Sequence, residues 1–220
     1  MKSSKHSRLG ARLGIYIVGL MLISFAIALS VKCNLGVSPV SSLPYVISQI
    51  VGISLGTCSI LVYTVYILIQ MILGGRKFQP ALLLQLLFVT FFGYFTDLAK
   101  YLLDPFTPST YLGQLLMLAA SIMLLSFSIV LYVDAKIVPM PAEGLVACIS
   151  EKYSIPFSKV KMVFDCASVA VGLTLCFLFL GRVVGIREGT VLTAVLVGKM
   201  TGLIRKVLSP WMQRVCFGEE

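Results

Sequence analysis

The sequence predicts an all-α integral membrane protein with six transmembrane helices arranged as two inverted three-helix repeats. Each repeat is expected to carry a short Pro-broken helix after its first span. Three observations support this: 58% of the 220 residues are hydrophobic and 12% are charged, charged residues divide the chain into apolar segments of membrane-crossing length, and the order of broken and unbroken segments occurs twice. A mean hydropathy of +0.98 excludes a disordered chain and a soluble enzyme with a polar shell.

The first span is predicted at Leu13–Val31, after the basic tail 1–12. These 19 residues carry no charge, whereas the apolar core of a secretory signal peptide has roughly 7–15 residues. No small-residue cleavage site follows them. We therefore expect an uncleaved transmembrane helix.

The next 43 residues, 33–75, are uncharged and are about twice as long as one crossing needs. Glycines and prolines crowd the first half of this stretch, so it is expected to hold a short broken helix, followed by a span at Thr57–Leu73. The remaining spans are predicted at Ala81–Leu103, Tyr111–Val133, Val160–Gly181 and Gly189–Leu208. The repeats then cover 13–103 and 111–208, and 209–220 forms a C-terminal tail.

The net charge of +9 is interpreted as a consequence of how the chain is oriented in the membrane, and no nucleic-acid partner is expected. Basic residues concentrate in the short cytoplasmic loops of membrane proteins. With a cytoplasmic N-terminus, 13 of the 18 Lys and Arg residues fall inside. The sequence therefore predicts that both termini are cytoplasmic.

An internal repeat is indicated by a shift of 102 residues, which superimposes segment 31–43 on segment 133–145 with three identical residues. A shift of about 105 residues relates 92–98 to 197–203. Because each half has three full spans, the second half must enter the membrane from the opposite side. Paired Pro-interrupted segments in inverted halves are the best sequence indicator of a transporter's central site.

The candidate substrate-binding residues lie in these two Pro-containing segments. A helix that begins inside the membrane offers unpaired N–H groups to a ligand, and serine hydroxyls can cap or bind. The alternative is that each short helix lies flat in the membrane interface, and the sequence leaves this open. The residues are Ser38, Pro39, Ser41 and Ser42 in the first half, and Pro141, Glu143 and Gly144 in the second.

Three ionisable residues inside predicted helices are candidates for charge coupling, namely Glu143, Asp165 and Lys199. Such residues are costly in a membrane and usually face a protein interior or a watery cavity. Lys199 would need a carboxylate such as Glu143 or Asp165 nearby, and either Lys199 or Lys161 could be the charge partner of Glu143. The alternatives are a structural cap for Glu143 and an ion pair of Asp165 with Lys161, one turn away.

Metal, cofactor and enzyme chemistry are not expected. The six cysteines show no CxxC spacing, and the one histidine, His6, lies in the basic tail. No nucleotide-binding loop or nucleophile with a base is evident. The spacings Gly52-xxx-Gly56 and Gly198-xxx-Gly202 are interpreted as faces of close helix packing.

Four segments together resemble the YitT/YczE-like group of bacterial membrane proteins: GVSPVSSLP after the first span, MPAEGL, FSKVKMVFD and REGT. The resemblance extends over roughly residues 15–208. It implies a multi-pass protein of the bacterial cytoplasmic membrane built from two similar halves. The position that matches Glu143 in the first half is Ser41, so the halves are not expected to play equal roles.

The leading functional hypothesis is a small transporter or exporter of an unidentified small molecule, with its site between the two Pro-broken segments. The second is a non-transporting accessory protein that supports another secretion or signalling system. A polar cavity between the broken helices would discriminate between them. The expected partners are the lipid bilayer and a small-molecule substrate, and self-association into a homo-oligomer stays open.

Overall fold

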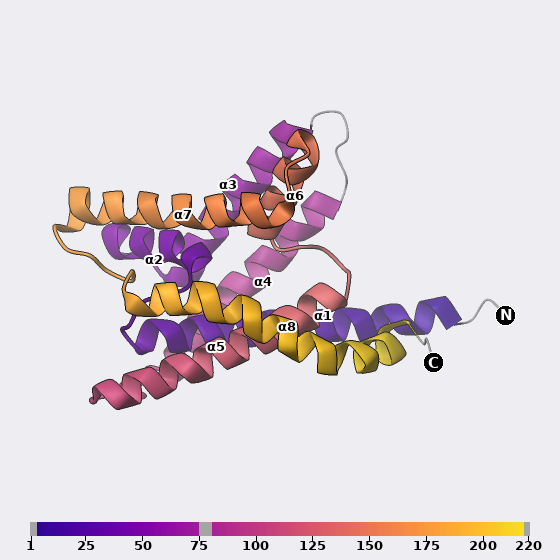
Figure 1. The fold of residues 1–220 in the computed structure, drawn as a ribbon, viewed down its shortest axis with the longest axis horizontal. Helices are drawn as coiled ribbons and strands as arrows, with labels where there is room; N and C mark the ends of the chain where they lie inside the picture. Colours follow the sequence, from indigo (N-terminus) through magenta and orange to yellow (C-terminus); the bar gives the residue numbers. More distant parts are fainter. Residues whose placement is uncertain (1–3, 75–80, 218–220) are drawn as a thin grey trace.

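The computed structural model describes residues 4–74 and 81–217, and within these ranges the chain is helical with short connections (Figure 1). Side chains are described for residues 9–74 and 84–216. The helices are α1 (Ser4–Lys32), α2 (Pro39–Val51), α3 (Leu55–Gly74), α4 (Ala81–Leu102), α5 (Tyr111–Asp134), α6 (Pro141–Tyr153), α7 (Phe157–Leu175) with its π-helical extension Cys176–Leu180, and α8 (Glu188–Phe217).

The order of these helices is the predicted one, with a short helix after the first long helix of each half. Two boundaries differ from the prediction. Helix α1 begins at Ser4, inside the expected basic tail, and α8 continues past Pro210 to Phe217, through most of the expected C-terminal tail. Hydropathy locates the apolar part of a helix, but a helix can continue into water where the residues favour it. Arg76 and Lys77, which the orientation argument uses, lie outside the described residues.

Four of the described helical segments are long and apolar enough to cross a membrane: Leu9–Lys32, Leu55–Gly74, Tyr111–Asp134 and Phe157–Leu180. Helices α4 and α8 were also expected to span, but they are not in this set. Charged residues, among them Lys199 and Arg205, dilute the apolar character of α8, whereas the side chains of α4 are described only from residue 84 on. The chain is thus an all-helical membrane protein, and its full number of spans stays a prediction.

The backbone around the two short helices repeats at the 102-residue shift found in the sequence. Each helix has 13 residues and starts with a proline, Pro39 or Pro141. Left-handed residues precede both helices, Asn34 at φ 55° and Lys136 at φ 51°. Left-handed residues also end both, Gly52 at φ 74° and Ser154 at φ 53°. Segments 34–52 and 136–154 therefore begin and end alike, although Gly36 has a φ of 111° and its counterpart Val138 has no positive φ.

Helices α1 and α5 form the centre of the molecule and run in opposite directions (Figure 1). Helix α4 packs on α1, and α8 packs on α5. The short helices are exchanged between the halves, because α2 packs chiefly on α7, and α6 on α3. These contacts of the first half therefore have counterparts in the second: α1–α4 matches α5–α8, and α2–α7 matches α6–α3.

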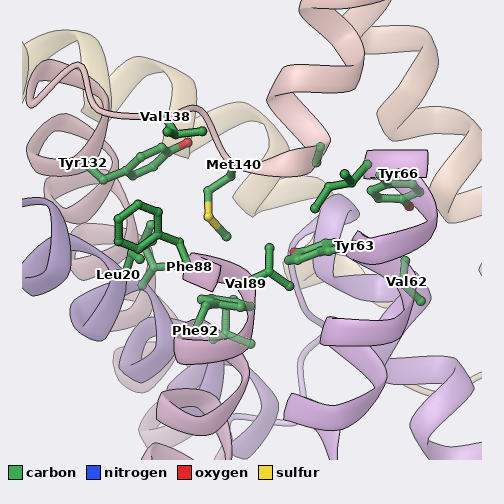
Figure 2. Packing of buried hydrophobic residues seen from close by; sticks show 14 of the residues in the cluster. Leu20, Val62, Tyr63, Tyr66, Phe88, Val89, Phe92, Tyr132, Val138 and Met140 are labelled. Carbon is green, nitrogen blue, oxygen red and sulfur yellow. The ribbon is translucent and has the colours of Figure 1, made fainter. Parts of the chain in front are cut away.

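The main core lies where α1, α3, α4 and α5 meet the loop before α6 (Figure 2). Its largest buried members are aromatic, and the rings of Tyr16 and Phe88 have centroids 4.6 Å apart. On the other side of Met140, the ring of Tyr63 lies between those of Tyr66 and Phe92. This cluster fixes the second Pro-containing segment against the first half of the chain.

The two halves differ in how their last two helices pack. Helices α3 and α4 meet at Gly56 and Gly93, and a Cβ atom added to Gly56 would approach the Gly93 carbonyl oxygen to 2.1 Å. Helices α7 and α8 form no comparable interface. An added Cβ atom would have no neighbour within 4 Å at Gly198 or Gly202. The interpretation of Gly198-xxx-Gly202 as a packed face is therefore wrong for this structure, since glycines permit close approach without enforcing it.

Candidate functional site

A cavity of about 820 Å³ lies between the two Pro-containing segments, and α7 and α8 contribute to its wall. Ser38, Pro39 and Ser41 line it from the start of α2. Met140 and Glu143 line it from the start of α6. The remaining wall comes from α1, α3, α4, α5, α7 and α8, so all eight helices contribute. The structure thus brings together the starts of both short helices at one cavity.

Three of the predicted site residues support the wall from behind without lining the cavity. The buried Ser42 hydroxyl donates to the Pro39 carbonyl at 2.7 Å. The Pro141 carbonyl accepts a hydrogen bond from Gln70 Nε2 at 3.0 Å. Gly144 faces the same glutamine, and an added Cβ atom there would lie 2.6 Å from Gln70 Oε1. These residues fix the shape of the cavity.

Glu143 is placed in the first turn of α6, and its carboxyl group faces the cavity. Its Oε2 atom is buried and has no hydrogen-bond partner in the described structure. The Tyr132 hydroxyl is a hydrogen-bonding neighbour of this carboxyl, and Lys161 and Asp165 act on it electrostatically. A buried carboxylate oxygen without a hydrogen-bond partner costs free energy, and a bound ligand or a proton can reduce that cost.

Asp165 also lines the cavity, and its Oδ1 atom accepts a hydrogen bond from Lys161 Nζ at 2.6 Å. The i, i+4 ion pair considered from the sequence is therefore present. Lys199 does not join these groups. It lies exposed on α8 and is not among the residues that line the cavity. The lysine beside Glu143 is Lys161, because the rotation of α8 about its axis turns Lys199 away.

The sequence analysis missed two glutamines that position the second Pro-containing segment. Gln70 of α3 and Gln85 of α4 donate to the carbonyls of Pro141 and Pro139, each at 3.0 Å. Both glutamines are buried, and Gln85 Oε1 has no partner among the described residues. An uncharged polar residue inside a long apolar helix is the signal that could have found them.

Where α1 ends and α8 begins, hydrogen bonds to backbone carbonyls connect segments that are distant in the sequence. Val37 N–H donates to the Gly185 carbonyl at 2.9 Å, and Gly189 N–H donates to the Leu35 carbonyl at 2.8 Å. The Arg187 guanidinium donates to the Asn34 carbonyl at 2.9 Å. These bonds join the segment before α2 to the segment before α8.

Lys32 and Asp134, which correspond at the 102-residue shift and have opposite charges, each form an ion pair at the end of a long helix. Lys32 at the end of α1 contacts Asp104 at 2.6 Å, and Asp134 at the end of α5 contacts Arg205 at 2.7 Å. Asp104 lies in the loop after α4. Its hydrogen bond with the Lys32 ammonium holds the pKa of the Asp104 carboxyl below its usual range.

Fold and cavity together define a multi-pass helical membrane protein with a ligand-sized cavity between two Pro-started helices. Residues 10–206 match the family of unknown function DUF6198, and the chain belongs to that family. It is 26% identical over 198 residues to the uncharacterized membrane protein YczE of Bacillus subtilis, covering 89% of this chain and 84% of that protein. The YczE-like resemblance seen in the sequence is thereby confirmed.

A second relative is the uncharacterized protein YyaS of Bacillus subtilis, 26% identical over 202 residues that cover 90% of this chain and 92% of YyaS. No solved structure matches this chain. Both relatives match over nearly their whole length, so the similarity covers both halves and the cavity between them.

Proposed function

We propose that the protein is a small-molecule transporter of the bacterial cytoplasmic membrane, with its substrate site in the cavity between α2 and α6. The observation that carries this proposal is the cavity itself, since one space is lined by the starts of both Pro-broken helices. Its volume of about 820 Å³ is within the range of roughly 300–1,000 Å³ typical of small-molecule sites. We propose no enzymatic activity.

We further propose six spans, formed by α1, α3, α4, α5, α7 and α8, in two inverted repeats. The repeated backbone at a 102-residue shift supports two equivalent halves. The opposite directions of α1 and α5 support their inversion (Figure 1). In this arrangement α2 and α6 are re-entrant helices whose starts meet near the middle of the membrane, as in transporters with broken helices.

The distribution of basic residues supports cytoplasmic N- and C-termini. With that orientation, the cavity-lining residues Lys136, Phe157 and Arg205 lie toward the cytoplasm. The Gly56–Gly93 contact then lies toward the outside. We propose that the cavity is open toward the cytoplasm, and that transport requires α3 and α4 to separate while α7 and α8 close.

The test is uptake into proteoliposomes of a panel of small molecules of different charge, with and without a proton gradient. A variant that fills the cavity, Ala194→Trp, should abolish protein-dependent uptake. Ala167→Trp, on an exposed position of α7 that does not line the cavity, is the matched control and should transport normally. Uptake of every solute at the rate of empty liposomes would overturn the proposal.

The second candidate is the non-transporting accessory protein. A packed scaffold needs no cavity with a buried carboxyl group, and each unmet polar group costs free energy in a membrane. The unpartnered Oε2 atom of Glu143 is therefore the observation that favours transport over a scaffold role.

A further inference from the structure

We propose that the cavity binds an organic molecule with a single positive charge and an apolar body, and that the Glu143 carboxylate binds its cationic group. This inference rests on the proposed function and specifies the substrate class of the same site. It is carried by three features of the cavity: the balance of charge around Glu143, the aromatic groups beside it, and the apolar character of the rest of the wall.

The charges around Glu143 leave one negative charge uncompensated. The charged side chains that act on Glu143 are Lys161 and Asp165, and Lys161 is bonded to Asp165 at 2.6 Å. With Glu143 and Asp165 both ionised, the two carboxylates and the one ammonium group give this cluster a net charge of −1, and a bound cation favours this ionised form. One additional positive charge neutralises it.

The other cations that line the cavity do not supply that charge. Arg205 is paired with Asp134 at 2.7 Å, and Lys136 has an interaction partner of its own. Lys161 is the cation whose charge acts most strongly on Glu143. An anionic ligand at Glu143 would therefore meet a carboxylate, whereas a cationic ligand would complete the cluster.

Aromatic side chains flank the same region. Tyr132 is a neighbour of the Glu143 carboxyl, and Tyr63 and Phe92 line the cavity with ring centroids 5.7 Å apart. Figure 2 shows Tyr63 and Phe92 on one side of Met140 and Tyr132 on the other. Aromatic rings attract organic cations through their negative faces, and this attraction strengthens where water is excluded.

The rest of the wall suits an apolar body. Ile23, Ile27, Leu125 and Ile129 line the cavity from α1 and α5, and Val197 lines it from α8. A small inorganic cation would leave these side chains without contacts and would need several oxygen ligands around it. The cavity therefore fits an amphipathic cation better than a metal ion.

The experiment uses two probes of nearly the same shape and opposite charge, tetraphenylphosphonium and tetraphenylborate. Binding to the full-length protein is measured by equilibrium dialysis in detergent, with protein-free micelles as the blank. We expect saturable, protein-dependent binding of tetraphenylphosphonium that tetraphenylborate does not displace. This comparison uses the wild-type protein and does not depend on how a variant folds.

Glu143→Gln should weaken tetraphenylphosphonium binding at least tenfold, because it removes the charge with little change in shape. Glu151→Gln is the matched control on the same helix, since Glu151 is exposed and does not line the cavity. It should bind as the wild type does. Size-exclusion profiles and thermal unfolding show whether both variants fold.

Equal binding by a folded Glu143→Gln variant, equal displacement by tetraphenylborate, or no binding of the cation to the wild type would each overturn the proposal. These outcomes are separate from the proteoliposome panel. Uptake of a neutral or anionic solute alone would leave the transporter function intact and reject the cationic substrate. Absence of all uptake would reject the transporter function itself.

Discussion

The different packing of the two halves gives a quantitative prediction for two glycines. Gly56 lies in the close contact between α3 and α4, whereas Gly198 lies on an open face of α8. In Gly56→Ala, the new Cβ atom would lie 2.1 Å from the Gly93 carbonyl oxygen and 2.6 Å from the Asp97 carboxylate. Real Cβ contacts essentially never fall under 3.0 Å. Helices α3 and α4 must therefore move apart by about 1 Å or more to accept the methyl group.

Overpacking of this kind costs roughly 1–3 kcal/mol. The movement also stretches the hydrogen bond from Gly56 N–H to Asp97 Oδ1, which is 2.7 Å long. A hydrogen bond to a charged group contributes about 1.5–3 kcal/mol, whereas alanine favours the helix over glycine by about 1 kcal/mol. We expect the free energy of unfolding to fall by about 2–4 kcal/mol.

Gly198→Ala introduces the same methyl group where no atom lies within 4 Å of the new Cβ. The clash is absent and only the helix propensity remains, so we expect a change between zero and about 1 kcal/mol of added stability. The assay is reversible unfolding in mixed micelles, with sodium dodecyl sulfate as the denaturant and circular dichroism as the signal. Equal destabilisation by both variants would show that α7 and α8 also pack closely and would refute the asymmetry.

Three further predictions concern other parts of the fold. Gln70→Leu leaves the buried Pro141 carbonyl without its donor and should lower stability by about 1–3 kcal/mol in the same assay, whereas Gln49→Leu, at an exposed position of α2, should have little effect. The lowered pKa of Asp104 means that its ion pair with Lys32 stabilises the protein above the ordinary carboxyl pKa and is lost as the pH falls through the lowered value; Asp104→Asn should remove this acid-dependent loss from a series of thermal unfolding measurements. A reporter fused at Glu220 should read as cytoplasmic, and an external reading would contradict the six-span orientation.

Local features of the sequence determined the secondary structure well. Long uncharged segments predicted the apolar helices, because membrane crossing requires about 20 apolar residues. Proline predicted the starts of both short helices, Pro39 and Pro141, because its fixed φ and missing N–H group suit the first helical turn. The start of α1 and the end of α8 were missed, because no comparable local signal marks how far a helix continues beyond its apolar part.

The candidate site was predicted in part for the same reason. Ser38, Pro39, Ser41 and Glu143 were found because they occupy the starts of the short helices, and these starts do line one cavity. The partners of Glu143 come from α5 and α7, and no spacing along the chain relates them to it. The sequence could therefore name Lys161 and Lys199 only as alternative charge partners of Glu143, and Tyr132 was not noticed.

The sequence by itself determined which segments are apolar helices and where the two short Pro-started helices begin, because each of these properties follows from residues close together in the chain. The tertiary structure decided which face of each helix is buried, and it alone turned Lys199 away from the cavity and brought Lys161 beside Glu143. It also decided that α3 packs on α4 while α7 and α8 stay apart. The rotation of each helix about its axis and the distance between two helices depend on packing between side chains from distant parts of the chain. Local sequence patterns do not contain that information.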